Sequence, residues 1–372
     1  MTAFYWTFLA LTASSWFISW ALFAKFKTVP EVPQSTRPQD SLSKISVIIP
    51  ARDEESNLAR LLPSIFEQSF PVHEVLVIND QSSDETASMA EKHGATVING
   101  LPLPDGWKGK SWACTQGGKC ATGDWLLFLD ADTWLEPDGL ERIAYLANSP
   151  NVVHSICPFH KIEEPFEEFS AFPNATMALG TNAFSLKGDK ANGIALFGQS
   201  LFVSKANYIA VGGHESVKHH ILENFQLSSS FRKIGVEPRC YLGRGTIGMR
   251  MFQTNLSDLK ASWAKGIVSG ADSTPKGALI GISIWISGQI MSTIALAFIP
   301  LAPMQVLWGI AALYLAFALQ TLFLFRKIGS FSIFNALFYP IGQAFYQFLF
   351  FQSLSRKKRG ETIHWKGRDV SD

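Results

Sequence analysis

The sequence is short of charge and of cysteine. Asp, Glu, Lys and Arg make up 17% of its 372 residues, below the roughly 25% usual for soluble domains. The formal net charge is only +1, which gives no reason to expect nucleic acid as a partner. The four cysteines include no CxxC pair, which argues against a zinc site or a disulfide framework and fits a reducing compartment.

Several binding motifs are also absent. There is no GxGxxG, so a Rossmann dinucleotide site has no support, and there is no HExxH zinc motif. "GKS" at 109–111 looks like the end of a P-loop, but Pro104 stands where that motif needs a glycine. This excludes a Walker-type ATPase. Lys110 is kept as a candidate diphosphate contact, the alternative being a solvated lysine at a helix start.

Apolar residues are abundant instead, at 47%, and they are concentrated in long runs. Residues 3–24 are uncharged and long enough to span a bilayer, and Lys25 and Lys27 follow directly. This pattern predicts an uncleaved anchor over 1–27 with its downstream side cytoplasmic. Membrane helices are also expected over 277–354, in three apolar stretches at 278–300, 303–325 and 331–354. Pro340 and several polar residues in the third stretch are compatible with a broken or re-entrant helix.

The region 45–248 has a different pattern, and a Pro- and Ser-rich linker at 28–44 separates it from the anchor. Short apolar runs alternate with helical segments, which predicts an α/β domain with a doubly wound, mostly parallel sheet. The expected strands lie at 45–50, 74–80, 95–99 and 125–132. The expected helices between and after them include 82–93, 110–121 and 137–147.

Three of these strands end in acidic residues, in "IIPARDEE", "VINDQSSD" and "FLDAD". A lone acidic strand end is more often a turn former. However, ligands of open α/β sheets bind beyond the carboxyl ends of the strands, so three such ends argue for a site. Asp130 and Asp132 are two residues apart and point the same way on an extended chain. They suit Mg²⁺ or Mn²⁺, held together with phosphate oxygens.

The segment 249–272 has apolar residues at helical spacing with cationic neighbours. The apolar residues include Phe252 and Trp263, and the cations include Lys265. The pattern predicts an interfacial amphipathic helix lying on the lipid bilayer, although such a stripe can also pack on its own domain. The tail, 355–372, is basic.

Taken in order, "SVIIPARDEESNL", "VLVINDQSSDET", "GKSWACTQGGKCATGDWLLFLDADT", "VGGHES" and "ILENFQLSSSFRKIG" resemble a family-2 glycosyltransferase of the GT-A fold. The anchor, "GWKGKSWA", "SWAKG", the C-terminal apolar runs and "WKGR" resemble membrane enzymes that glycosylate terpenoid lipids. These are the carotenoid-acid (diaponeurosporenoate-type) and hopanoid-associated glycosyltransferases.

The resemblance implies a nucleotide-sugar donor, UDP-glucose, a divalent metal and inversion at the anomeric carbon. It places the donor at Pro50, Arg52, Glu54, Asp80 and Asp130, the metal at Asp130 and Asp132, and catalysis at Asp132 and Glu223. Lys110, kept above as a candidate diphosphate contact, is added to the expected donor site. Trp263, Phe252 and Lys265 would face the lipid acceptor and the membrane.

The chain departs from the family's pattern at two places. Family members often have Tyr-Asn where this chain has Arg52-Asp53, and they usually have Glu-Asp where it has Glu223-Asn224. The Asp of that second pair commonly deprotonates the acceptor, which Asn224 cannot do. Either Glu223 is the base, or the acceptor is a carboxylic acid that is already ionised at neutral pH.

These inferences predict a multi-pass enzyme of the cell membrane with a cytoplasmic catalytic domain, which moves glucose to a terpenoid lipid, favouring the carboxylate of a carotenoid acid. The alternative acceptors are a hopanoid, a glycerolipid or a polyprenyl phosphate. A polysaccharide synthase is a nearer rival, but its QxxRW motif is absent, since Ser262 precedes Trp263. A nucleotide-binding membrane protein without catalysis is the alternative from another class. Ion translocation is disfavoured because the apolar stretches lack charged residues.

Overall fold

The computed structural model describes residues 2–33, 44–219, 223–252, 255–359, 363–365 and 368–370. The chain divides into two compact units. Unit 1 is mainly helical and comprises Met1–Phe26, Lys161–Asn192 and Phe252–Gly360. Unit 2 contains the main sheet and comprises Lys27–His160, Gly193–Met251 and Glu361–Asp372. The expected continuous domain 45–248 is therefore interrupted, because 161–192 packs with the helices of unit 1.

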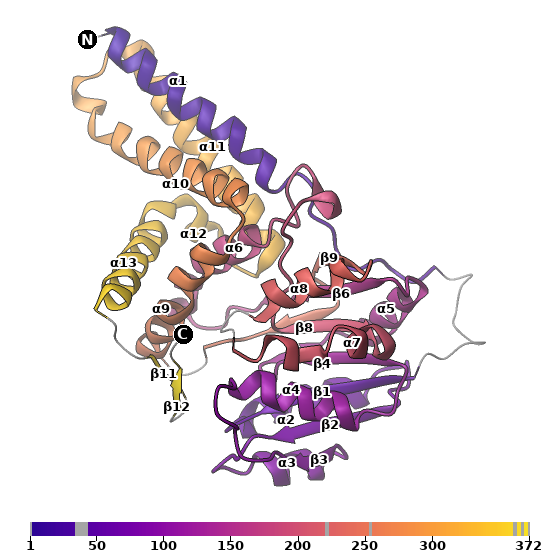
Figure 1. Ribbon diagram of the computed structural model, residues 1–372. Helices are drawn as coiled ribbons and strands as arrows, with labels where there is room; N and C mark the ends of the chain where they lie inside the picture. The colour runs from indigo at the N-terminus through magenta and orange to yellow at the C-terminus, as the bar shows by residue number, and fades with distance from the viewer. Residues whose placement is uncertain are drawn as a thin grey trace. The chain divides into compact units, whose positions relative to one another are not determined.

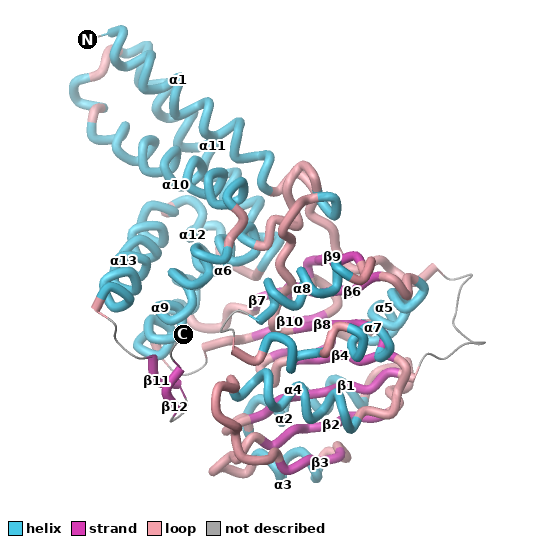
Figure 2. Tube along the Cα trace, viewed as in Figure 1, coloured by secondary structure: helices cyan, strands magenta, loops and turns pink. Residues whose placement is uncertain are grey.

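Unit 2 is built on a seven-stranded sheet in the order β3-β2-β1-β4-β8-β6-β9 (Figures 1 and 2). The strands, in that order, are Thr96–Asn99, Glu74–Asn79, Ile45–Ala51, Trp125–Leu129, Ser200–Ser204, Val152–Cys157 and Glu237–Leu242. All pairings are parallel except those of β8, which runs antiparallel to both β4 and β6. The mostly parallel sheet expected from the sequence is confirmed.

Helices cover both faces of this sheet, which is why its central strands are apolar throughout. Every residue of β4 is buried. On one face, Leu58, Leu61, Leu62 and Ile65 of α2 share a core with alternate residues of β1. The helices of unit 2 are α2 Glu55–Phe66, α3 Thr86–Lys92, α4 Gly109–Cys120, α5 Gly139–Tyr145, α7 Lys205–Ala210 and α8 Glu223–Lys233, with 3-10 turns η3 Leu146–Asn148 and η6 Gly213–Val217.

Two smaller sheets complete the strands of the structure. The first has the order β5-β10-β7, with bounds Thr133–Leu135, Ile247–Met249 and Phe159–His160. Its strand β5 follows β4 after a turn that contains Asp130 and Asp132, so it fixes the far end of that turn. The second pairs β11, Ile363–Trp365, with β12, Arg368–Val370.

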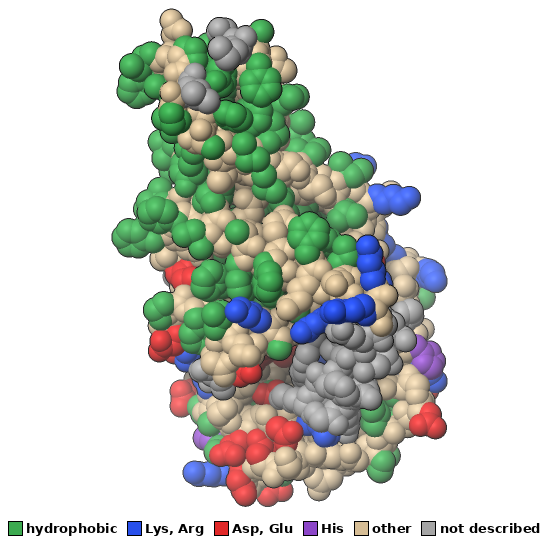
Figure 3. All heavy atoms as spheres, turned by 90° about the vertical axis from the view of Figure 1, so that its left-hand side faces the viewer, with side chains coloured by type: hydrophobic (Ala, Val, Ile, Leu, Met, Phe, Trp, Pro, Cys, Tyr) green, Lys and Arg blue, Asp and Glu red, His purple; other side chains and the backbone are tan. Residues whose placement is uncertain are grey.

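Unit 1 consists of helices, some of them strongly apolar. They are α1 Thr2–Ser19, α6 Ala171–Gly180, α9 Leu256–Ser273, α10 Lys276–Ala297, α11 Met304–Ile328, α12 Ile333–Leu337 and α13 Tyr339–Lys358, with 3-10 turns η1 Trp20–Leu22, η4 Pro165–Ser170, η5 Gly188–Lys190 and η7 Ile299–Leu301. Hydrophobic side chains cover much of the helical face drawn in Figure 3.

Among the described residues, α10 and α11 are long and apolar enough to cross a membrane. They match the first two C-terminal stretches expected from the sequence. The expected anchor forms the helix α1. It is not among these helices, because its Thr, Ser, Tyr and Trp residues lower its mean hydropathy. The third expected stretch is not one long helix, since it breaks at Phe338 into α12 and α13.

Candidate active site

Three neighbouring parallel strands bring the predicted site residues to one edge of the main sheet. β1 pairs with β2 up to Ala51↔Asn79 and with β4 at Ile48↔Phe128. The residues that follow these strands, Arg52, Asp80 and Asp130, therefore emerge side by side. This is the sheet edge at which α/β proteins bind ligands.

A cavity of about 150 Å³ opens at this edge. It is lined by the ends of β1, β2 and β4 and by the first turn of α4, at Pro50, Ala51, Arg52, Glu54, Asp80, Gly109, Lys110, Ala113, Asp130, Ala131 and Asp132. Every residue predicted for the donor or the metal lies in this lining. Glu223 does not.

The carboxylate pair lies in the turn between β4 and β5. The backbone of Asp130 is held on both sides: its N–H donates to the carbonyl of Gln199 at 3.0 Å, and its carbonyl accepts from the Thr133 hydroxyl at 2.7 Å. Asp132 is held less well, because its buried Oδ1 has no hydrogen-bond partner. Burial, followed by the negative charges of Asp130 and Glu54, raises the pKa of Asp132 to about 7.

These residues fit a divalent cation. Mg²⁺ in nucleotide sites is commonly held by one or two carboxylates plus phosphate oxygens, not by a closed protein shell. In the described part of the chain, no three His, Cys, Asp or Glu side chains are placed to form such a shell. A cation shared by Asp130, Asp132 and a diphosphate would satisfy the unpartnered Asp132 oxygen and relieve the repulsion between the two carboxylates.

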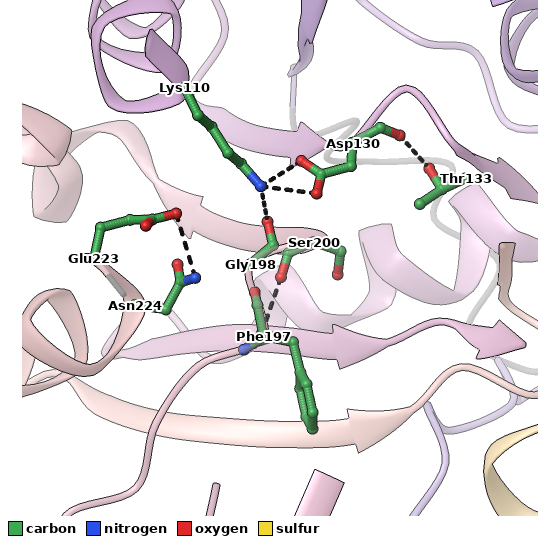
Figure 4. Close-up of polar contacts among 9 residues, drawn as sticks. Lys110, Asp130, Thr133, Phe197, Gly198, Ser200, Glu223 and Asn224 are labelled. Carbon is green, nitrogen blue, oxygen red and sulfur yellow. Dashed lines mark hydrogen bonds and ion pairs between the residues drawn. The ribbon is translucent and has the colours of Figure 1, made fainter. Parts of the chain in front are cut away.

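Lys110, in the first turn of α4, forms an ion pair with Asp130 (Figure 4). Its Nζ lies 2.5 Å and 2.8 Å from the two carboxylate oxygens of Asp130 and donates to the carbonyl of Gly198 at 2.9 Å. Burial by itself would lower the pKa of Lys110, but the charges of Asp130 and Glu223 raise it above its ordinary value. The ammonium group is therefore fixed in its charged form at the mouth of the cavity.

One wall of the cavity is formed by the loops after β1 and β2. Arg52 Nη1 donates to the main-chain carbonyl of Asp80 at 2.9 Å. Asp53 adopts a left-handed φ of 52° and accepts from the Ser83 N–H at 2.7 Å. These bonds lock the Arg52-Asp53 segment, where the chain departs from the family's Tyr-Asn, onto the loop that carries Asp80.

Glu223 opens α8 and is buried. Burial raises its pKa, with a smaller rise from Asp130, while Lys110 opposes the shift. Asn224 Nδ2 donates to Glu223 Oε1 at 3.4 Å (Figure 4). Glu223 is thus electrostatically coupled to Lys110 and Asp130 from outside the cavity lining.

Gly198, directly before β8, is a site residue that the sequence did not suggest. Its carbonyl holds Lys110, and a Cβ at this position would come within 2.6 Å of Asn224 Nδ2 and 3.6 Å of Lys110 Nζ. A side chain at this position would displace the Asn224 amide, while Lys110 Nζ would remain at van der Waals distance. A main-chain carbonyl leaves no motif, so the glycine before an apolar run was the one available signal.

The structure corrects the expected exposure of the acceptor-side residues. Phe252 and Trp263 are buried within unit 1, with their rings 6.0 Å apart, and Trp263 Nε1 donates to Ser170 Oγ at 3.2 Å. The apolar stripe of α9 therefore packs on its own unit, where Phe252 is an apolar partner and Ser170 of η4 a polar one for Trp263. The side chain of Lys265 lies outside the described part of the structure.

Comparison with known proteins identifies the family. The model of "Glycosyl transferase family 2" matches residues 46–201, which include β1, β2, β4 and the carboxylate pair. The 4,4'-diaponeurosporenoate glycosyltransferase of Staphylococcus aureus strain USA300 is 34% identical over 331 residues, which are 88% of each chain. The chain belongs to glycosyl transferase family 2. The protein of the same name from strain MRSA252 is equally similar.

The family's GT-A fold is also found among solved structures. A mannosyltransferase from Pyrobaculum calidifontis, solved with GDP-Man and Mn²⁺, superposes with a TM-score of 0.54 at 15% identity and covers 95% of this chain and 98% of its own. At this identity the likeness establishes the fold alone. Membership of family 2 makes the protein a glycosyltransferase.

Proposed function

We propose that the protein is an inverting, metal-dependent glycosyltransferase that moves glucose from UDP-glucose to the carboxylate of a membrane terpenoid acid of the carotenoid class. The catalytic unit would face the cytoplasm, where nucleotide sugars are found. α10 and α11 would cross the cell membrane, and Lys25 and Lys27, which follow α1 and η1, would lie on the cytoplasmic side.

The observation that carries the donor site is the unpartnered oxygen of Asp132 beside Asp130 at the carboxyl edge of the sheet. Asp130 and Asp132 would hold Mg²⁺ or Mn²⁺. When bound, the ion would neutralise charge that grows on the diphosphate leaving group. Lys110 adds a fixed positive charge that can reach the same phosphates, while Pro50, Arg52, Glu54 and Asp80 would enclose the nucleoside.

The acceptor class rests on the pair Glu223-Asn224 and on the relative whose name specifies diaponeurosporenoate, a carboxylic acid. An acceptor carboxylate oxygen would attack the anomeric carbon while the bond from that carbon to the diphosphate oxygen breaks. The leaving nucleoside diphosphate would keep the electron pair, and no proton would need to be removed. Glu223 would then position the acceptor or the donor sugar.

An alcohol acceptor is the second candidate, and one observation favours it. Burial raises the pKa of Glu223, which makes its carboxylate a better proton acceptor than an exposed one. In that case Glu223 would take the proton of the acceptor hydroxyl, and the product would be an ether-type glycoside.

The product decides between the two. The purified full-length protein, reconstituted in lipid, is given UDP-glucose with a radioactive sugar and either a carotenoid acid or the corresponding alcohol. We expect transfer to the acid, loss of transfer in excess chelator, and release of the label by mild alkali. An alkali-stable product would reject the ester and return the base role to Glu223, and full activity in chelator would reject the metal.

A further inference from the structure

The last helix of unit 1, α13, shows a partial reversal of the polarity expected in water. Its buried face carries Gln343 and Ser353 beside Tyr346 and Leu349, while its exposed face carries Ile341, Phe348 and Phe351. In a water-soluble protein the apolar stripe of such a helix faces the core. An apolar outer face with amides and hydroxyls inside is expected where the surroundings are hydrocarbon.

α10 and α11 show the same reversal and also define the ends of the bundle. Gln289 Nε2 donates to Thr321 Oγ1 at 2.8 Å in the interior, and the short connection 298–303 makes the two helices antiparallel. The start of α10 at Lys276 and the end of α11 at Arg326 and Lys327 therefore lie toward the same end of the pair. We call this the cationic end.

The α12–α13 hairpin leaves the cationic end and returns to it. Near its turn, the carbonyl of Leu337 accepts from Tyr314 OH at 2.8 Å, and Tyr339 OH contacts Ser292 Oγ. Both partners lie well inside α11 and α10, with Tyr314 about 18 Å along the helix from Arg326 at 1.5 Å per residue. The last turn of α13 is back at the start of α10, since Lys357 pairs with Asp272 at 2.5 Å.

The break in this hairpin is satisfied by protein groups. Glu168 of η4 accepts from the Ser332 N–H at 2.9 Å and from Asn335 Nδ2 at 2.6 Å. The N–H of Phe338 donates to the carbonyl of Phe334 at 2.8 Å. Non-helical backbone is tolerated at membrane depth only when its polar groups are paired in this way.

From these contacts we propose that α12–α13 is a re-entrant hairpin whose outer face contacts the acyl chains of one leaflet. That face consists of the exposed apolar residues Phe334, Phe338, Ile341, Phe348 and Phe351. The bilayer is the occupant because the face continues the apolar surface of α10 and α11 and ends in the basic last turn of α13, at the cationic end. The inference rests on the membrane location proposed above, and it adds that the third apolar stretch enters and leaves on one side.

Depth is tested with a matched pair of isoleucines. Ile341 on the hairpin and Ile209 on α7 of unit 2 are equally exposed, at 61% and 63%. In a Cys120→Ser background, Ile341→Cys and Ile209→Cys are each labelled with an environment-sensitive fluorophore, and the full chain is reconstituted in phosphatidylcholine–phosphatidylglycerol vesicles. We expect the Ile341→Cys label to shift to shorter wavelength and to be quenched by acyl-chain nitroxides, while the Ile209→Cys label responds to aqueous iodide.

Two outcomes overturn the proposal in this test. One is equal iodide quenching of both labels, which would place Ile341 in water. The other is energy transfer between labelled copies without nitroxide quenching, which would mean that a second copy of the chain covers the face.

Sidedness is tested with Arg326→Cys and Lys358→Cys, which flank the hairpin at exposed positions. An impermeant maleimide should label both from the same side of sealed vesicles, and labelling from opposite sides would mean that the segment crosses. Sugar transfer is measured on the same samples. Loss of sugar transfer with same-side labelling would reject the proposed function but support the re-entrant hairpin. Opposite-side labelling with sugar transfer intact would reject the hairpin but support the proposed function.

Discussion

At the scale of single residues, Asp132 is the most exacting test of the donor site. Asp132→Asn removes one charged ligand from a turn whose backbone is held by other residues, so the fold should survive. We expect sugar transfer to fall by at least roughly 100-fold, equivalent to about 2.7 kcal/mol of barrier. The rate is measured with UDP-glucose at saturating Mg²⁺ or Mn²⁺.

The control lies at the other end of the same strand. Asp124 precedes β4 and is exposed, so Asp124→Asn changes the net charge equally but leaves the cavity intact. Near-normal turnover of Asp132→Asn, or an equal loss in Asp124→Asn, would contradict the assignment of Asp132 to the metal.

Glu223→Gln separates the two acceptor classes. With a carboxylate acceptor no proton is transferred, so the substitution should lower kcat by less than about tenfold. With an alcohol acceptor the loss should be about 10²–10⁴-fold, as for removal of a general base. Glu215→Gln, which changes an exposed glutamate on η6, is the matched control. A loss of more than a hundredfold with the acid acceptor would contradict the expectation that Glu223 is dispensable when the acceptor is already ionised.

The sequence could place the residues at the strand ends and Lys110, but not Gly198 or the burial of Glu223. Asp130 and Asp132 follow an apolar strand, and a strand's position in a parallel sheet determines where its end lies. The carbonyl of Gly198 and the burial of Glu223 depend on β8 and α8, which are far from Asp130 in the sequence. No local pattern encodes such contacts.

At the scale of elements, α4 carries Lys110 and its position depends on one glycine. A Cβ on Gly117 would collide with Ile48 of β1 and come within 3.1 Å of Ile78 of β2. Gly117→Ala should therefore destabilise the protein by about 1–3 kcal/mol through overpacking. The readout is the thermal midpoint of the full chain in detergent, together with sugar transfer.

Gly277→Ala serves as the control, because a Cβ there meets nothing within 4 Å. Because position 277 is in a helix, the Gly277→Ala substitution should leave the free energy of unfolding unchanged or raise it by about 0.5–1 kcal/mol. If both variants melt at the same temperature, a side chain at position 117 does not disturb the packing of α4 on the sheet.

The helices and strands could be predicted where the spacing of apolar residues along the chain identifies them. β1, β2, β3, β4 and their helices follow from short apolar runs alternating with amphipathic segments. A break in the third apolar stretch was expected from Pro340, but the antiparallel insertion of β8 and the capping of α12 could not be predicted, because both depend on partners distant in sequence. Glu168, for example, caps a segment more than 160 residues further along the chain.

At the scale of the whole molecule, buried histidines make the fold sensitive to acid. Burial, followed by the positive charge of Arg239, lowers the pKa of His154 to about 3, and burial with Lys110 does the same for His214. As the pH falls below 6.5 the unfolded chain takes up these protons before the folded one, so stability is lost between pH 6.5 and about 3. At pH 5 each site should cost about 2 kcal/mol.

His154→Phe keeps a ring among the aromatic neighbours Phe202 and Tyr241 but removes the titration. The fall in thermal midpoint between pH 7 and pH 5 should therefore be smaller in this variant than in the parent chain. His219→Gln, at an exposed position, should leave the fall unchanged. An identical pH dependence for His154→Phe and the parent would refute the role of His154.

The interleaving of the two units has a practical consequence for making this protein. The chain passes from one unit to the other at 26/27, 160/161, 192/193, 251/252 and 360/361. Removing both termini would therefore not separate unit 2 from all of the apolar helical unit. The internal segment 161–192 of unit 1 would remain. Its Phe172, whose ring centroid lies 5.8 Å from that of Trp285 and 5.3 Å from that of Phe325, would lose both of these aromatic contacts.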